Sequence, residues 1–196
     1  DRAVVMSLDA RELGAARATW AAVRAQCATS PERLLPAAAC DPRELADPSP
    51  EGIAAGVNRL VEEGSVLFGE YVPNIGLDDP LNLAVFAGLE RTGLPVTIHI
   101  CTTLGEGGYG LYDEPGLPRL AAILERFPNL VIIGHSQAFW SEIDKDLDPA
   151  ARGGYPAGPV TPGRLVELMR RYPNLHADLS GKSGRNALER DPAHAE

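Results

Sequence analysis

Long hydrophobic runs, paired cysteines and a surplus of basic residues are all missing from this 196-residue sequence. No stretch approaches the ~18 uninterrupted apolar residues of a membrane span, and none resembles a signal peptide. A formal net charge of −9 argues against nucleic-acid and anionic-membrane partners, because both require basic patches. None of these absences bears on a small-molecule substrate.

The cysteines are few and do not form a pattern. Cys27, Cys40 and Cys101 are odd in number, widely spaced and free of any C-x-x-C pairing. This spacing predicts no disulfide scaffold and favours a reducing, cytoplasmic compartment. Cys101 follows His99 closely enough to line a site, although a small buried apolar residue is the favoured interpretation.

What is present is the composition of one well-buried domain over residues 1–196, with 44% hydrophobic and 23% charged residues. Six β-rich runs recur along the chain, and most are continuously apolar. This pattern is typical of parallel strands buried on both faces. Pro36 weakens the second run, because proline cannot donate a ladder hydrogen bond. The runs are 3–8, 34–39, 66–70, 96–100, 130–135 and 175–180.

Amphipathic segments between the runs predict helices. Asp79 and Pro80 are expected to begin one helix and Gly93 to end it, while Thr161 and Pro162 are expected to begin the last one. The apolar stripes of these helices are interpreted as core packing. The stripes are Ile53, Val57, Leu60 and Val61; Leu83, Phe86 and Leu89; Leu117, Leu120, Leu124 and Phe127; and Leu165, Leu168, Met169 and Tyr172.

Strands and helices therefore alternate, and residues 126–130 (RFPNL) resemble 171–175 (RYPNL), as one βα module written twice. This order is shared by a (β/α)₈ barrel and an open doubly wound sheet. No G-x-G-x-x-G follows the first run, whereas polar residues stand at the ends of several runs. A barrel gathers such ends on one face, so we expect a partial (β/α)₈ TIM-like barrel with about six strands visible. The polar residues are Asp9, Glu70, His99, His135 and Asp178.

The two histidines are the strongest candidates for chemistry. His99 and His135 each end a predicted strand, and the two strands are consecutive. Imidazole is a common zinc ligand and also titrates near neutral pH as an acid or base. A catalytic zinc takes three protein ligands and a water, so two histidines alone do not complete a site. Spacing alone leaves a purely structural role for both residues equally open.

Three stretches carry a resemblance to a known family: 94–99 (LPVTIH), 113–117 (DEPGL) and 126–135 (RFPNLVIIGH). Together with 139–140 (FW) and 172–180 (YPNLHADLS), they are similar to amidohydrolase-related proteins, the group that includes aminocarboxymuconate-semialdehyde decarboxylase. The likeness runs from about Val66 to Asp191, and the phrase ending in Gly134 and His135 is the most specific part.

The resemblance implies a role for each histidine. His99 matches a metal ligand after the fifth barrel strand, and His135 matches the residue after the sixth that orients or activates the metal-bound water. The first visible strand would then be barrel strand two. The family's His-x-His ligand pair would precede Asp1, and its metal-binding aspartate would follow Glu196. No His-x-His occurs in this sequence.

Two acidic residues complete the candidate site. Glu70 ends the third run at a position where some related enzymes use a carboxylate ligand, and ligation and a structural hydrogen bond are equally open for it. Asp178 could hold the site or the substrate, and a supporting role behind the ligands is favoured because a buried aspartate must be paired. Asp9 is interpreted as a loop cap. The glycine-rich loop 105–110 is expected to shape the site.

These residues lead to one functional prediction. We expect a hydrolase that uses a divalent metal, Zn²⁺ in the first instance, to activate water against a small organic substrate, with Glu70, His99 and His135 on the metal. His135 would shuttle a proton and Asp178 would assist it. Non-oxidative decarboxylation within the same family and a non-catalytic barrel fragment are the alternatives. Association into a homo-oligomer is left open.

Overall fold

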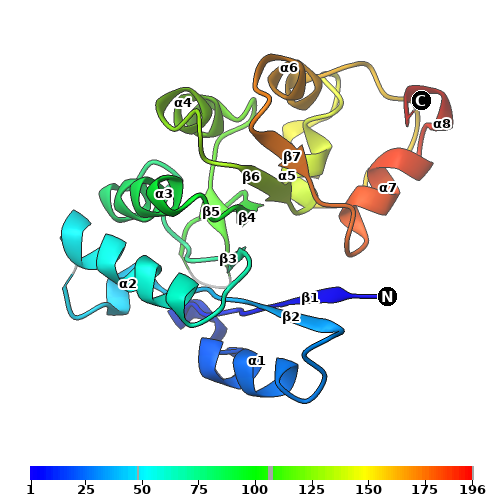
Figure 1. Cartoon of the computed structure of the whole chain (residues 1–196). Helices are drawn as coiled ribbons and strands as arrows, with labels where there is room; N and C mark the ends of the chain where they lie inside the picture. Colours follow the sequence, from blue (N-terminus) through cyan, green and yellow to red (C-terminus); the bar gives the residue numbers. More distant parts are fainter. Residues whose placement is uncertain (48, 106–107, 196) are drawn as a thin grey trace.

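The computed structural model describes residues 1–47, 49–105 and 108–195. Parallel strands lie in the middle of the molecule and helices lie along the outside (Figure 1). The strands are β1 (Ala3–Met6), β2 (Leu34–Ala37), β3 (Phe68–Tyr71), β4 (Val96–Cys101), β5 (Leu111–Tyr112), β6 (Ile132–His135) and β7 (Leu175–Ala177). The helices are α1 (Trp20–Cys27), α2 (Pro50–Glu62), α3 (Pro80–Thr92), α4 (Pro118–Arg126), α5 (Gln137–Ser141), α6 (Arg164–Arg171), α7 (Ser183–Glu189) and α8 (Pro192–Ala195). Short 3₁₀ segments cover Arg11–Ala16, Pro42–Glu44 and Pro149–Ala151.

The order of the strands is that of a partial barrel. β1 pairs with β2, and β3, β4, β6 and β7 follow one another in a second parallel sheet. A bridge from Ala38 to Phe68 and a hydrogen bond from Val66 N to the Pro36 carbonyl (3.1 Å) join β2 to β3. Each predicted strand therefore lies beside the next, which confirms the expected α/β barrel arrangement of about six strands. The described residues do not close the barrel.

Two helices test the sequence signals that predict where a helix begins and ends. Asp79 caps α3 by accepting a hydrogen bond from Leu81 N (2.9 Å), and Gly93 ends it with a left-handed φ of 69°, as expected. The expected start of α6 at Thr161 is wrong. The Thr161 carbonyl instead accepts a bond from Lys145 N (3.0 Å), and the Thr161 N–H donates to the Asp144 carboxylate (3.2 Å). The helix begins at Arg164, after Gly163.

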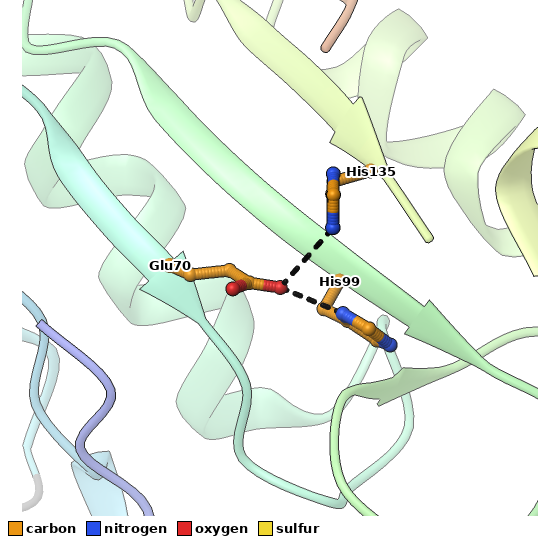
Figure 2. Close-up of side chains that lie close together, drawn as sticks. All are labelled: Glu70, His99 and His135. Atoms are coloured by element: carbon orange, nitrogen blue, oxygen red, sulfur yellow. Dashed lines mark hydrogen bonds and ion pairs between the residues drawn. The ribbon is translucent and has the colours of Figure 1, made fainter. Parts of the chain in front are cut away.

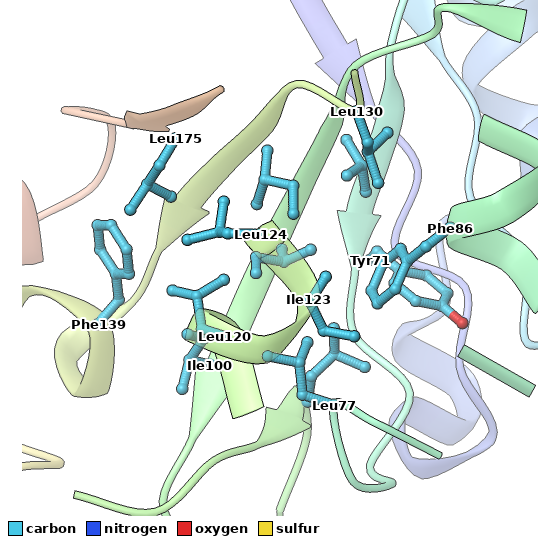
Figure 3. Close-up of a cluster of buried hydrophobic side chains, with 14 of the residues drawn as sticks. Tyr71, Leu77, Phe86, Ile100, Leu120, Ile123, Leu124, Leu130, Phe139 and Leu175 are labelled. Atoms are coloured by element: carbon cyan, nitrogen blue, oxygen red, sulfur yellow. The ribbon is translucent and has the colours of Figure 1, made fainter. Parts of the chain in front are cut away.

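The core lies between the helices and one face of the sheet (Figure 3). On β4 the side chains of Val96, Ile98 and Ile100 belong to this core. Because successive side chains of a strand alternate between its faces, His99 lies on the opposite face, which is the inner face of the partial barrel. Met169 departs from its predicted core role: it is 40% exposed, so the buried stripe of α6 is narrower than expected. None of the described helices is long and apolar enough to cross a bilayer.

Candidate metal centre

Three side chains from neighbouring strands converge at the carboxyl ends of the sheet. Glu70 comes from β3, His99 from β4 and His135 from β6, and Figure 2 shows them pointing toward one another. One oxygen or nitrogen from each lies within 4.8 Å of those of the other two. The two imidazole centroids are 5.5 Å apart. The structure thus brings together the three residues that the sequence nominates as metal ligands.

Glu70 connects the two histidines. Its Oε1 lies 2.6 Å from His99 Nδ1 and 3.8 Å from His135 Nε2. The first distance is that of a hydrogen bond, so a proton occupies the space between Glu70 and His99. All three side chains are largely shielded from water, with exposed fractions of 15% for Glu70, 9% for His99 and 16% for His135.

The donor set fits a divalent ion. Two imidazoles and one carboxylate are a ligand combination that hydrolytic zinc sites use, with a fourth position left for water. One possible donor atom from each of the three residues lies within 4.8 Å of those of the other two, which is close enough for all three to share one cation. The positions of the three side chains and their donor atoms therefore both suit a divalent ion.

Asp178 lies on the far side of His135 from Glu70. Its Oδ2 is 2.9 Å from His135 Nδ1, which is an ion-pair distance, although Nδ1 makes no hydrogen bond of good geometry with the described residues. Asp178 stands just beyond β7 rather than inside the strand. Its position is fixed by a bond from its own N to the Gly134 carbonyl (2.9 Å) and by Trp140 Nε1, which donates to its carbonyl (3.0 Å).

The backbone of the loop after β4 packs closely against His99 at Gly110. At Gly110, which has a φ of 101°, a Cβ atom would lie 2.7 Å from both His99 Cδ2 and the His99 carbonyl oxygen, so only glycine fits there. Asn74 holds this loop, because its Nδ2 donates to the carbonyls of Thr103 (2.9 Å) and Gly110 (3.2 Å). Asn74 belongs to no sequence motif, so nothing in the sequence pattern nominates it. Residues 106 and 107 of the predicted glycine-rich loop lie outside the described residues.

Beside the histidines is a cavity of about 240 Å³. Tyr109 lies on one wall, with its ring centroid 4.5 Å from that of His99. Cys101 also lines the cavity, but its thiol is directed to backbone carbonyls of Thr103 and Gly110, and burial raises its pKa. The cavity is lined further by Thr102, Thr103, Gln137 and Gly153.

The remaining candidates lie elsewhere. Asp9 does not act as the expected cap: its carboxylate pairs with Arg17, whose Nε donates to it at 2.7 Å, and the residue that precedes the 11–16 segment is Ala10. His176 pairs in register with Ile133, one step below the two histidines, and is exposed. Phe139 and Trp140 are buried; the Phe139 ring packs against Gly134, and Trp140 packs while its Nε1 donates to the Asp178 carbonyl.

Comparison with known proteins gives the family. A sequence model of the amidohydrolase family matches residues 3–196, nearly the whole chain. The chain belongs to the amidohydrolase family, as the resemblance of its motifs implies. No curated protein matches the sequence.

One solved structure agrees with the fold, and two others are more distantly similar. An uncharacterised TIM-barrel protein from Bordetella bronchiseptica is 18% identical with a TM-score of 0.61, over 100% of this chain and 58% of the other. 5-Carboxyvanillate decarboxylase from Sphingomonas paucimobilis is 17% identical with a TM-score of 0.46, over 86% and 56%. 2,6-Dihydroxybenzoate decarboxylase from Rhizobium is 16% identical with a TM-score of 0.44, over 86% and 60%. The chain thus spans less than two thirds of the length of these structures.

Proposed function

We propose that Glu70, His99 and His135 bind one divalent ion, Zn²⁺ in the first instance, in a metal-dependent hydrolase of small organic substrates. The observation that carries the proposal is the convergence of one carboxylate and two imidazoles within 4.8 Å, at the carboxyl ends of parallel strands. That end of a barrel is where catalytic sites form. A bound ion would supply Lewis acidity for a carbonyl and lower the pKa of water.

His135 is the proposed acid–base group. Asp178 at 2.9 Å from Nδ1 favours a proton on that nitrogen, which leaves the lone pair of Nε2 facing Glu70 and the centre of the site. Nε2 can then act as a ligand or accept a proton from attacking water, one role at a time. Asp178 stabilises the imidazolium that forms when Nε2 takes the proton, and Trp140 keeps Asp178 in place.

The substrate would lie in the cavity beside His99. At about 240 Å³ the cavity is smaller than the sites of about 300–1,000 Å³ that hold drug-sized ligands. Thr102, Thr103 and Gln137 offer polar contacts in its lining. This supports a small-molecule substrate. A cytoplasmic location and a homo-oligomeric state remain predictions.

Turnover tests the proposal. The protein should be loaded with Zn²⁺ and incubated with panels of amides, lactones and esters, and hydrolysis products measured. We expect His135→Ala to abolish hydrolysis without loss of the fold, since His135 lies at a strand end outside the apolar core. His176→Ala is the matched control and should keep full activity. Equal activity in both variants would remove His135 from the mechanism.

Non-oxidative decarboxylation uses the same donors and is the second proposal. The carbon–carboxylate bond would break, carbon dioxide would leave, and the carbon that keeps the electron pair would take a proton from the His135 imidazolium. The His135–Asp178 ion pair supports this, because it stabilises the imidazolium that this step needs. Aromatic carboxylates added to the same panel decide between the two: carbon dioxide release without hydrolysis would reject hydrolysis. A metal-loaded protein that is inert in every assay would favour the non-catalytic alternative.

A further inference from the structure

We propose that Lys182 is the substrate-recognition residue of this site and that it selects small organic monoanions by pairing with their carboxylate. The inference rests on the proposed function, and it extends that function to the charge of the substrate. It depends on a set of contacts at the rim that includes Tyr109, Gln137, Tyr155 and Lys182, here called the rim cluster.

The rim cluster draws on three loops and on the first residue of α5, Gln137, all distant from one another in sequence. Lys182 Nζ lies 4.7 Å from the centroid of the Tyr155 ring. Gln137 Nε2 donates a hydrogen bond to the Tyr155 hydroxyl at 3.0 Å, and Gln137 lines the same cavity as His99. Burial raises the pKa of Tyr109, and the nearby charges of Glu70 and Tyr155 raise it further. Tyr109 lies beside His99, with ring centroids 4.5 Å apart, and lines the same cavity.

Lys182 also follows a residue that contacts the site directly. Gly181 lies so close to His135 that a Cβ atom on it would be 3.5 Å from His135 Cε1. The loop after β7 thus contacts His135 through Gly181, supports its Nδ1 through Asp178, and carries the ammonium of Lys182 at the rim. Lys182 is thus linked to the cavity through Tyr155 and Gln137, and Gln137 lines it.

The negative charges around the site explain why an ammonium there would help an anionic substrate to bind. Glu70 and Asp178 contribute negative charge at the site, and the whole chain carries a formal charge of −9. A bound Zn²⁺ would offset the charge of Glu70 and Asp178, so the repulsion of an incoming anion would come from the acidic chain around the site, where a cation near the cavity would reduce it. An ammonium that lies over an aromatic ring keeps its charge of +1. It can therefore pair with one carboxylate. The Tyr109 and Tyr155 rings would contact the body of the bound molecule.

The sequence provides an internal control. It contains only two lysines, Lys145 and Lys182. Lys145 is exposed and borders a different cavity, with Glu142 and Arg164. Reductive ¹³C-methylation keeps the positive charge of both lysines and gives each an NMR signal, which the Lys182→Gln variant assigns.

The test titrates the methylated, Zn²⁺-supplemented protein with benzoate and, separately, with its neutral counterpart benzamide. We expect the Lys182 signal to shift saturably with benzoate and little with benzamide, while the Lys145 signal stays fixed. In the unmethylated protein, Lys182→Gln should weaken benzoate binding about fivefold, Lys182→Arg should largely restore it, and Lys145→Gln should leave it unchanged. Equal responses to the two probes, no shift, or unchanged binding in Lys182→Gln would overturn the proposal.

A separate measurement shows whether the proposed metal site binds Zn²⁺. Zn²⁺ uptake is measured on the same samples, and its absence would reject the proposed function while the lysine signals still report on Lys182. Normal Zn²⁺ uptake without a benzoate-specific shift would reject the role of Lys182 alone.

Discussion

His99 and His135 are direct partners in the parallel register of β4 and β6. Two residues paired in this way leave the sheet on the same face and at the same height, because parallel neighbours share one pleat. The side chain of Glu70, from the strand on the other side of β4, reaches the same point. The convergence of these three side chains is therefore a property of strand order and register, and changes that preserve both should preserve it.

The first prediction concerns the support of His99. Gly110→Ala would place a methyl group 2.7 Å from both the ring and the carbonyl of His99, and should displace that residue. We expect weaker Zn²⁺ binding and a lower melting temperature, measured by isothermal titration calorimetry and thermal unfolding. Gly64→Ala is the control, because Gly64 has a similar φ of 98° but no atom within 4 Å of the added Cβ. It should cost about 1 kcal/mol of stability and leave Zn²⁺ binding intact. Equal Zn²⁺ affinity in both variants would contradict the account.

The second prediction concerns Asp178. Asp178→Asn keeps the shape of the side chain but removes the charge beside His135 Nδ1. Losing such a supporting contact behind a ligand lowers activity by about 10- to 100-fold. We expect a fall of this size in kcat/KM for whichever substrate is turned over. Asp146→Asn, an exposed aspartate, is the control and should have no effect. The role of Asp178 fails if both variants behave like the parent protein.

The third prediction tests the packing beneath the site. At Gly134 an added Cβ would lie 2.1 Å from the Phe139 ring, so Gly134→Ala must displace a buried aromatic residue. Overpacking of this kind costs about 1–3 kcal/mol of unfolding free energy. Gly56→Ala, in α2 with nothing within 4 Å of the new atom, should instead stabilise the protein by roughly 0.5–1 kcal/mol. Chemical denaturation of the two variants should give changes of opposite sign.

The fourth prediction concerns the pH dependence of stability. Burial raises the pKa of Asp113 from 3.8 to about 6, although its carboxylate accepts bonds from the backbone N–H groups of Glu114, Arg119 and Leu120. The native chain therefore retains a proton that the unfolded chain has released between these pH values. The contribution of Asp113 to the unfolding free energy should fall as the pH rises through this interval, by on the order of 3 kcal/mol.

Comparison with Asp113→Asn isolates this effect, because the amide does not titrate. The unfolding free energy of the parent protein, measured against that of the variant, should decrease from pH 4 to pH 6 and become level above it. A difference that is constant with pH would show that Asp113 keeps an ordinary pKa in the native state.

The sequence predicts the six parallel strands because each is a continuous apolar run, which is the direct consequence of burial on both faces. It does not predict β5, since Leu111–Tyr112 is a two-residue strand inside a glycine-rich loop. It also misses α1, in which only Val23 and Cys27 are buried, so the helix has little apolar periodicity. The apolar runs of the sequence are longer than the observed strands because apolar residues continue into the adjoining turns.

The sequence predicts which residues form the site, but it does not predict the contacts among them. Glu70, His99 and His135 stand at strand ends, and strand ends are visible in the pattern. The shared contact of Glu70 with both imidazoles depends on the irregular register between Phe68 and Tyr71, which the alternation of residues does not encode. The contacts among Gln137, Tyr155 and Lys182 depend on the paths of long loops, for which the sequence has no periodic signal.

The most direct test of the shared metal site is the stoichiometry of metal binding. Co²⁺, whose visible absorption reports its nitrogen and oxygen ligands, should be titrated into the metal-free protein and into His99→Ala, His135→Ala and Glu70→Gln. The account predicts one Co²⁺ per chain in the parent protein and a weakened, spectrally altered site in each variant, with His176→Ala unchanged. Identical Co²⁺ stoichiometry, affinity and spectra in the parent and in the three ligand variants would contradict it.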